Sequence, residues 1–230
     1  MTWSISVIIP TLDEETRIGA CLARLSGEDL LETIVADGAS RDRTVAFARK
    51  AGARVVLAPP GRGTQLNRGT QAATGDILLF LHADTILPSG FPALVREALA
   101  RPGIVAGAFS FALDDTSAAL SVVAAMTNIR ARLLQLPYGD QGIFVRKKLF
   151  DELGGFADIP AMEDFELVRR LRRRGKIIIL PQAAITSARR WQCHGILRTF
   201  LVNQGMVLGF YLKKSPVRLA AWYRRGGRFR

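Results

Sequence analysis

Gly75–Thr85 has the sequence GDILLFLHADT. Its apolar run, Ile77–Leu81, is too short for an ordinary helix and is typical of a strand buried on both faces in a parallel sheet. The run ends abruptly at His82 and Asp84, whose side chains would share one face of an extended chain. Open α/β sheets bind ligands at the carboxyl ends of their strands, so this pair indicates a ligand site. Alternatively, the polar residues only begin a solvated loop or cap a turn.

Strand and helix patterns alternate on both sides of this run. Asp13 would cap the first helix, with Glu14 and Glu15 in its first turn. Ser40 or Asp42 would cap the second. This order predicts an α/β fold with a Rossmann-like, mostly parallel central sheet flanked by helices. We expect further strands at residues 4–9, 32–36, 54–57, 104–113, 142–146 and 176–180, and helices at 13–26, from 40 or 42 to 51, and at 64–73, 91–100, 117–136 and 160–175.

The composition is that of a globular protein. The chain has 230 residues, 49% of them hydrophobic, enough for one large α/β domain or two small ones. Cys21 and Cys193 have neither metal-ligand nor redox spacing, which suits a reducing compartment. No basic segment leads into an apolar one at the start, so we expect no signal peptide and a cytoplasmic location.

Charge is distributed unevenly along the chain. Glu166 is the last acidic residue, and residues 167–230 contain 16 Lys and Arg. The preceding part has 16 basic and 20 acidic residues, so the C-terminal part carries more than the whole net charge of +12. This asymmetry indicates an anionic partner: nucleic acid, anionic lipid headgroups or a phosphorylated acceptor. The alternative is a solvated basic face.

Three polar positions follow the ends of predicted parallel strands, at Pro10-Thr11, Asp37 and Asp84. The carboxyl ends of parallel strands meet at one rim, so these residues should lie together. Asp37 could accept a hydrogen bond from a nucleobase or ribose hydroxyl, or only from its own turn. The chain lacks GxGxxG after the first strand and GxxxxGK[ST] anywhere, which counts against dinucleotide-binding and P-loop folds.

The segment 59–67, PPGRGTQLN, leads into a predicted helix. Free amides at that helix start, together with Arg62, could hold a diphosphate. Gln65 and Arg68 are weaker candidates for the same role. The alternative is a flexible connector with a cap at Thr64.

Several motifs together resemble a known family. VIIPTLDEE, IVADGASRDRT and GRGTQLNRGTQAATGDILLFLHADT resemble, in order and spacing, the nucleotide-sugar half of a family 2 glycosyltransferase with the GT-A fold. GDQGIFVRKKLFDELGGF and AMEDFELVRRLRRRG are similar to the acceptor half of that family. The HADT motif resembles a bacterial subgroup of these transferases.

The resemblance implies a donor site and a metal. Asp84 would be the last acid of the Asp-x-Asp metal motif and the ligand of Mg²⁺ or Mn²⁺. This chain departs from the motif at His82, since imidazole suits Mn²⁺ better than Mg²⁺. Pro10, Thr11 and Glu14 would line the nucleoside pocket, and Asp37 would contact the base. The nucleotide-sugar site is thus assigned to Pro10, Thr11, Glu14, Asp37, Arg62, Gln65, Asn67, His82 and Ala83.

The resemblance also implies a catalytic base. Glu163 and Asp164 lie near the start of the helix predicted at 160–175, where capping alone would explain two acids. In a glycosyltransferase, Asp164 would deprotonate the acceptor hydroxyl and Glu163 would position it.

An acceptor site is expected from two further segments. The resemblance implies that Asp140 and Gln141 form one edge of the acceptor pocket. Arg189 and Arg190 could bind phosphate, and Trp191 could stack on a sugar or lipid. Alternatively, the three residues of the second segment pack on the surface.

The C-terminal part is apolar and then basic. Phe200–Leu212 is too short to span a bilayer, and Lys213, Lys214, Arg218, Arg224, Arg225, Arg228 and Arg230 follow it. This pattern is typical of an interfacial helix with a basic flank, or of a buried helix with a disordered tail. We expect one domain over 1–230: a nucleotide-sugar half at 1–113, an acceptor half at 114–195 and a helical basic tail at 196–230.

The function expected is metal-dependent, inverting transfer of a sugar from a nucleoside diphosphate sugar to a hydroxyl or phosphate acceptor. The acceptor could be lipid-linked, with contact at the inner face of the membrane. Other hypotheses are a non-catalytic nucleotide-sugar-binding protein, a nucleotidylyltransferase and a basic nucleic-acid-binding protein. The basic tail lacks interleaved aromatic residues at module spacing, so no nucleic-acid partner is expected.

Overall fold

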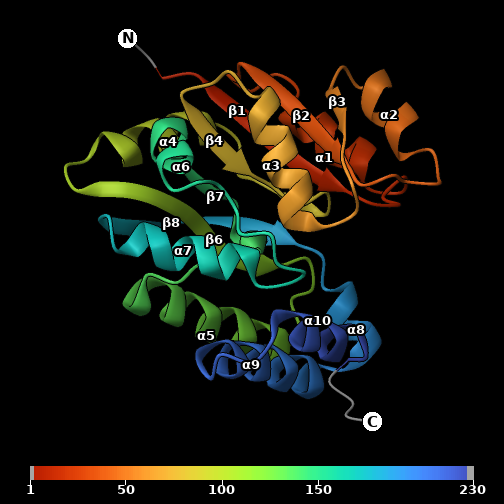
Figure 1. Cartoon of the computed structure of the whole chain (residues 1–230), viewed down its shortest axis with the longest axis vertical. Helices are drawn as coiled ribbons and strands as arrows, with labels where there is room; N and C mark the ends of the chain where they lie inside the picture. Colours follow the sequence, from red (N-terminus) through yellow and green to blue (C-terminus); the bar gives the residue numbers. More distant parts are fainter. Residues whose placement is uncertain (1–2, 227–230) are drawn as a thin grey trace.

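The computed structural model describes residues 3–226. Strands from both halves of the chain join one sheet of eight strands in the order β3-β2-β1-β4-β7-β6-β8-β5 (Figure 1). The strands are β1 Ile5–Thr11, β2 Glu32–Asp37, β3 Arg54–Leu57, β4 Ile77–Phe80, β5 Thr85–Ile86, β6 Ile104–Leu113, β7 Ile143–Arg146 and β8 Lys176–Thr186.

Helices cover the sheet on both faces. They are α1 Ile18–Leu25, α2 Thr44–Lys50, α3 Arg62–Ala72, α4 Phe91–Ala100, α5 Ala118–Leu134, α6 Lys147–Glu152, α7 Glu163–Arg172, α8 Arg189–His194, α9 Ile196–Tyr211 and α10 Pro216–Arg224, with a 3₁₀ turn η1 at Gly139–Gln141. Along β1, Ile5, Val7 and Ile9 face the core under α1 and α4, while Ile8 faces the core under α3 and α7. This alternation is the period of two expected of a strand buried on both faces.

The sheet is mostly parallel, as the sequence predicts. β3, β2, β1 and β4 are parallel neighbours, and β6 is parallel to β8. β7 runs antiparallel to both β4 and β6. Its register pairs Phe80, the last residue of β4, with Ile143, the first residue of β7. The segment after β4 and the segment before β7 therefore leave the sheet at the same edge.

Helix α3 packs closely on the sheet. A Cβ at Gly69 would lie 2.5 Å from a methyl carbon of Ile8. Glycine at this position therefore allows the helix backbone to approach β1.

Two predicted elements need correction. Asp13 does not cap the first helix, which begins at Ile18; Asp13 adopts φ 55° and binds the loop after β2, where its carboxylate accepts from the Arg41 N–H at 2.7 Å. His82 and Asp84 do not lie on an extended strand. β4 ends at Phe80, and the Thr85 N–H donates to the His82 carbonyl at 3.1 Å, which closes a turn.

The helix with the acidic pair starts close to its predicted position. It begins at Glu163, three residues after Pro160 and directly after Met162 in a left-handed conformation, and the acidic pair lies in its first turn as predicted. Glu163 and Asp164 are therefore its first two residues, which brings both carboxylates to the helix N-terminus.

The C-terminal helices form a layer below the β6–β8 side of the sheet (Figure 1). Trp191 of α8 packs with Phe111, Leu120 and Val123. Arg228 and Arg230, part of the predicted basic flank, lie outside the described residues. No helix within residues 3–226 is long and apolar enough to cross a membrane.

Candidate functional site

The site is centred on Gly139 of η1, where three separate segments meet. The Gly139 N–H donates to Asp164 Oδ2 at 2.7 Å. A Cβ at Gly139 would lie 2.9 Å from that oxygen and 3.2 Å from His82 Nε2. The turn after β4, the segment before β7 and the start of α7 thus converge at the edge of the sheet where parallel α/β sheets bind ligands.

Asp164 is held in its charged form. Burial alone would raise the pKa of this carboxyl, but Arg62 and the N–H groups of Gly139 and Phe165 lower it below its usual value. The Phe165 N–H donates to Asp164 Oδ1 at 2.8 Å, and an Arg62 terminal nitrogen lies 3.6 Å from the same oxygen. Backbone N–H groups therefore fix both oxygens of the carboxylate, and the Arg62 guanidinium lies beside one of them.

Arg62 contacts both acids at the start of α7. Its Nε donates to Glu163 Oε1, and its other nitrogen forms the ion pair with Asp164. Glu163 is 2% exposed, whereas the Arg62 side chain is 42% exposed. The guanidinium thus connects a buried carboxylate to the solvent side, where an anionic ligand could reach it.

His82 and Asp84 lie in the turn after β4. Burial and the charge of Arg62 lower the pKa of His82 to about 4, against the opposing effects of Asp84 and Asp164. The imidazole is therefore neutral near pH 7, as a ligand or hydrogen-bond acceptor must be. Cys21 lies beneath the turn; burial and then Asp84 raise the pKa of its thiol to about 12, so it is not a nucleophile.

The described residues offer few metal ligands. Within 3–226, no group of three or more His, Cys, Asp or Glu side chains is placed to hold a metal ion. Half-buried Asp84 and His82 are the nearest protein candidates. This sparse set does not suit a structural zinc site. It fits a Mg²⁺- or Mn²⁺-type ion that takes its other ligands from phosphates and water.

Asp37 lies beside Thr11, as the rim argument predicts. The Thr11 hydroxyl donates to Asp37 Oδ2 at 3.0 Å, and Ser40 donates to both carboxylate oxygens, at 2.9 Å from its N–H and 2.5 Å from its hydroxyl. Asp37 is 1% exposed. These contacts are those of a turn carboxylate that bonds its own loop. Its contact with a base stays a prediction.

Gln65 does not face a diphosphate. It is buried, and its amide nitrogen donates to the carbonyls of Thr11 at 2.7 Å and Ala36 at 3.0 Å. The side chain therefore joins the ends of β1 and β2, and the predicted phosphate role is replaced by a structural one.

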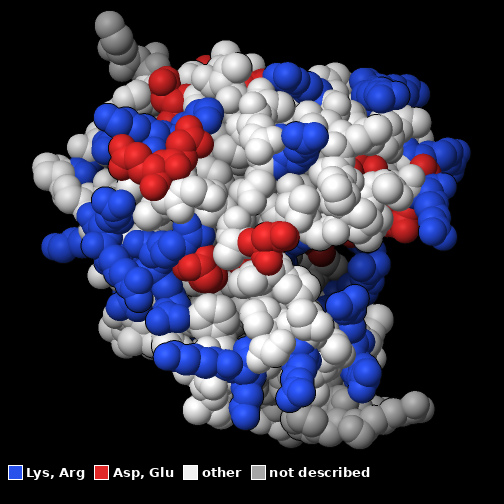
Figure 2. Space-filling model, viewed as in Figure 1, with Lys and Arg blue, Asp and Glu red and all other residues white. Residues whose placement is uncertain are grey.

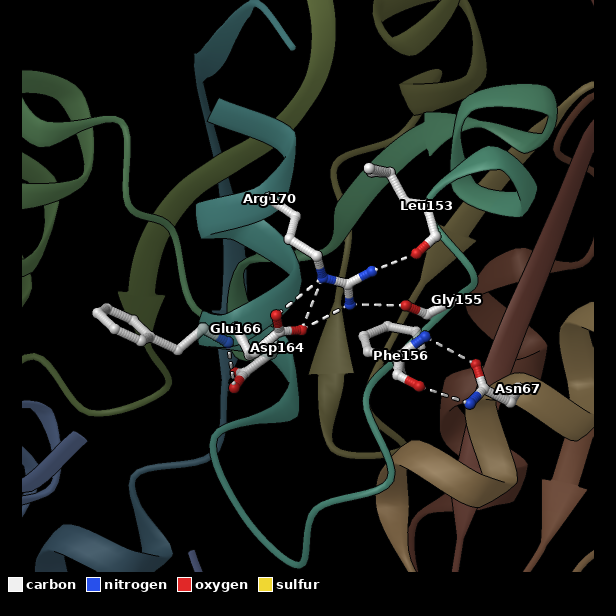
Figure 3. A network of polar contacts seen from close by, with 8 residues as sticks. Asn67, Leu153, Gly155, Phe156, Asp164, Glu166 and Arg170 are labelled. Carbon is white, nitrogen blue, oxygen red and sulfur yellow. Dashed lines mark hydrogen bonds and ion pairs between the residues drawn. The ribbon is translucent and has the colours of Figure 1, made fainter. Parts of the chain in front are cut away.

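Asn67 is likewise occupied. It donates to the Phe156 carbonyl and accepts from the Phe156 N–H, both at 2.9 Å, which fastens α3 to the loop before α7 (Figure 3). Arg68 is exposed and bonds Gln71 at 3.1 Å. Glu14 forms an ion pair with Arg17 at 2.7 Å. Pro10 is partly exposed and Ala83 is buried.

Arg170 completes the attachment of that loop. Its guanidinium donates to the carbonyls of Leu153 and Gly155, each at 2.7 Å, and is held by Glu166 at 2.5–2.8 Å (Figure 3). The loop before α7 is thus fixed both to α7 and, through Asn67, to α3. This arrangement sets the start of α7 against Arg62.

Beyond Asp164, Arg130 of α5 approaches the site. Its guanidinium carbon lies 3.5 Å from the centre of the Tyr138 ring. In the described part of the chain, its Nε and one terminal nitrogen are buried without a hydrogen-bond partner, as is Asp140 Oδ1. Burial and Asp164 raise the pKa of Asp140 to about 6, although Arg130 and Arg62 oppose the shift.

The three residues of segment 189–191 have different surroundings. Arg189 is exposed. Arg190 stacks on Tyr223 of α10 at 3.7 Å, and its Nε is buried without a partner among residues 3–226. Trp191 is only 9% exposed within its apolar cluster, so the prediction that its ring stacks on a sugar or lipid does not fit.

Gln141 does not line an acceptor pocket as predicted. It is fully buried, donates to the Phe109 carbonyl at 2.9 Å and accepts from the Tyr138 N–H at 3.0 Å. Both ends of the amide therefore hold η1 in place.

Sequence reasoning missed Arg130, Tyr138, Gly139 and Tyr223. A cation in an otherwise apolar helix was a signal for Arg130, and the PYGD turn was one for Tyr138 and Gly139. Tyr223 had none. Burial raises its pKa and Arg190 opposes this; its electrostatic interactions with Arg62, Asp140 and Asp164 place it beside the site.

Comparison with known proteins identifies a family. The model of the family described as Glycosyl transferase family 2 matches residues 6–154, which is more than half of the chain. A curated relative, the glucosyl-3-phosphoglycerate synthase of Mycolicibacterium paratuberculosis, is 38% identical over 115 residues. The match covers 44% of this chain and only 35% of that protein.

Solved structures share the fold. Mycobacterium tuberculosis glucosyl-3-phosphoglycerate synthase, crystallised with Mn²⁺, UDP-glucose and glycerol 3-phosphate, is 27% identical with a TM-score of 0.59, covering 79% of this chain and 70% of that one. A Pyrobaculum calidifontis mannosyltransferase, in complex with GDP-mannose and Mn²⁺, is 18% identical with a TM-score of 0.66, covering 90% and 63%. The sheet and its helices are therefore those of GT-A glycosyltransferases.

Proposed function

Because this chain belongs to glycosyl transferase family 2, we propose that it transfers a sugar, with inversion, from a nucleoside diphosphate sugar to an acceptor hydroxyl or phosphate. The observation that carries the proposal is the convergence at Gly139 of Asp164, His82 and Arg62. Such a displacement needs a base for the acceptor hydroxyl, a turn that can hold the metal ion, and a cation that stabilises the leaving diphosphate.

We assign the donor to the edge between Thr11 and Arg62. Asp84, with His82 beside it, would be the protein ligand of Mg²⁺ or Mn²⁺. Bound there, the ion would neutralise the departing diphosphate. The Mn²⁺-bound neighbours with UDP-glucose and GDP-mannose support this assignment. Arg62 would contact the diphosphate from its exposed side.

We assign proton transfer to Asp164. The Gly139 and Phe165 N–H groups orient its carboxylate. The carboxylate is ionised, as a base must be in order to accept a proton. In the structure, Arg62 neutralises that charge. Movement of Arg62 to the diphosphate would free Asp164 for the acceptor hydroxyl, while Glu163 would guide the guanidinium.

We propose a cytoplasmic enzyme that contacts the inner face of a membrane, with a lipid-linked acceptor as one option. The α5 residues Val122, Met126, Ile129 and Leu133 and the α9 residues Leu197, Leu201 and Leu208 are exposed apolar side chains on adjacent helices. Lys and Arg lie over the lower part of the face shown in Figure 2, which bears no Asp or Glu there. Exposed apolar side chains together with basic ones suit anionic lipid.

Thermal unfolding with a panel of nucleoside diphosphates, with and without Mn²⁺ or Mg²⁺, tests the donor site. A ligand of the folded state raises the midpoint by mass action. We expect a metal-dependent rise with one nucleotide, lost in Asp84→Ala and kept in Asp29→Ala, an exposed acid away from the site. Absence of a rise with every nucleotide would refute the proposal. A rise without release of nucleotide from UDP-glucose or GDP-mannose would favour a non-catalytic binding protein.

Membrane contact is tested separately by vesicle flotation. We expect wild-type protein to float with vesicles containing phosphatidylglycerol and not with phosphatidylcholine alone. Leu201→Ser with Met126→Ser should weaken flotation, whereas Leu31→Ser, another exposed leucine, should not. Equal flotation of all three proteins would exclude this face.

A further inference from the structure

We propose that Arg130 and Arg190 form a binding site for a phosphate group on the acceptor, beside Asp164. This inference rests on the proposed function and names the class of acceptor: a compound that carries a phosphate monoester near the hydroxyl that is glycosylated. The phosphate could belong to a soluble molecule or to a lipid headgroup.

Both guanidiniums are positioned in the same way. Arg130 lies over the Tyr138 ring at 3.5 Å and Arg190 over the Tyr223 ring at 3.7 Å. Stacking uses the flat face of a guanidinium and leaves the N–H groups at its edge available. Those edges can bind a phosphate through two parallel hydrogen bonds.

Buried guanidinium nitrogens of Arg130 and Arg190 lack a hydrogen-bond acceptor among the described residues, which indicates a site for an anion. In the described chain, Nε and a terminal nitrogen of Arg130 and Nε of Arg190 are buried with no acceptor. Buried donors of this kind are rare in native proteins, and an absent ion or ligand is a standard explanation. Burial lowers the pKa of Arg130, so its charge also lacks full compensation.

Arg130 stacks on Tyr138, the residue before Gly139, and Arg190 stacks on Tyr223, and both rings interact electrostatically with Asp164. Arg130 interacts electrostatically with Asp140 and Asp164, and Tyr223 interacts with the same two acids. Tyr138 is next to Gly139, whose N–H binds Asp164. An anion held by the two arginines would therefore bring the rest of its molecule toward Asp164.

The test compares a phosphate probe with its neutral counterpart. We expect glycerol 3-phosphate to raise the thermal midpoint of the wild-type protein with UDP or GDP and Mn²⁺ present, and glycerol to have no effect. Arg130→Met and Arg190→Met should each weaken the apparent affinity about 10- to 100-fold, as expected for a lost charged hydrogen bond. Arg24→Met, which removes an exposed arginine of α1, should leave it unchanged.

The outcomes separate this inference from the proposed function. The nucleotide-induced rise should survive in both test variants, and its absence in wild-type protein would refute the donor site alone. Unchanged glycerol 3-phosphate binding in the variants would overturn the phosphate site. Arg130→Lys and Arg190→Lys, which keep the charge but lose the fork, replace any variant that does not fold. No saturable response of wild-type protein to glycerol 3-phosphate or to phosphatidic acid vesicles would also overturn it.

The source of the phosphate is decided by transfer assays. Wild-type protein is incubated with labelled UDP-glucose or GDP-mannose and either glycerol 3-phosphate or phosphatidic acid vesicles. Arginine-dependent label in the aqueous product supports a soluble acceptor, and such label in the lipid extract supports a headgroup. Efficient transfer to glycerol that is unaffected by either substitution would contradict the phosphate site.

Discussion

Arg170→Met should destabilise the fold by releasing the loop before α7. The guanidinium donates to the Leu153 and Gly155 carbonyls at 2.7 Å each and pairs with Glu166 (Figure 3). Methionine retains the length of the aliphatic stem and removes all of these donors. The loop would then remain attached to α3 through Asn67 and through the 3.5 Å hydrogen bond from the Thr64 hydroxyl to Asp158 Oδ1.

The expected loss follows from those contacts. A hydrogen bond from a charged donor contributes about 1.5–3 kcal/mol, and two carbonyls lose one each. The Arg170 and Glu166 side chains are 21% and 26% exposed, so water recovers part of the loss and the ion pair adds little. We expect a decrease of about 3 kcal/mol in the free energy of unfolding, or about 6–12 °C in the midpoint for a chain of this size.

Urea and thermal unfolding followed by circular dichroism measure this change. Arg172→Met is the control, because Arg172 lies on the same helix and is exposed, and its effect should stay within about 0.5 kcal/mol. A loss in Arg170→Met no larger than that of the control would refute the reasoning that these hydrogen bonds hold the loop.

Three other substitutions test the site and its surroundings. Gly139→Ala should reduce nucleotide release from the donor about 100-fold with little change in nucleotide binding, because its methyl would displace Asp164 and His82; retained turnover would contradict this geometry. Trp191→Ala should lower the free energy of unfolding by about 3–5 kcal/mol in urea; lost acceptor binding at unchanged stability would restore a contact role. In metal-free protein, Asp140→Asn should raise stability by at most about 2–3 kcal/mol at pH 7 and not at pH 4. Because the pKa of Asp140 is raised to about 6, the folded state binds more protons than the unfolded state between about pH 4 and pH 6. The free energy of unfolding of the wild-type protein should therefore fall as pH rises through this range. The same dependence on pH in wild-type protein and variant would exclude this effect of Asp140.

Local patterns were sufficient for much of the fold. Arg54–Leu57, Phe91–Ala100 and Ile104–Leu113 begin and end where the sequence predicts, because turn residues bound each one and its apolar spacing has a single period. The first helix was placed too early because Asp13 has the chemistry of a cap. Its actual partner, the Arg41 N–H, lies 28 residues away, and such a contact has no local signature.

The sequence predicts which residues lie at the site better than it predicts which side chains they contact. Rim residues such as Thr11 and Asp37 do lie together, since parallel strands deliver their ends to one edge. The prediction that the side chains of His82 and Asp84 share one face of a strand is wrong, because the strand ends at Phe80 and the chain turns. The ion pair of Arg62 with Glu163 joins residues 101 positions apart, so only the folded chain reveals it.

The reversed direction of β7 allows the two sides of the site to vary independently. A parallel strand supplies residues to this edge only from the segment that follows it, whereas β7 supplies them from the segment before it. The length and composition of this segment can therefore change around Gly139 and Gln141, which fix its position, while the connections among β1, β2, β3 and β4 keep their geometry. One donor-side framework could in this way serve acceptors of different shape.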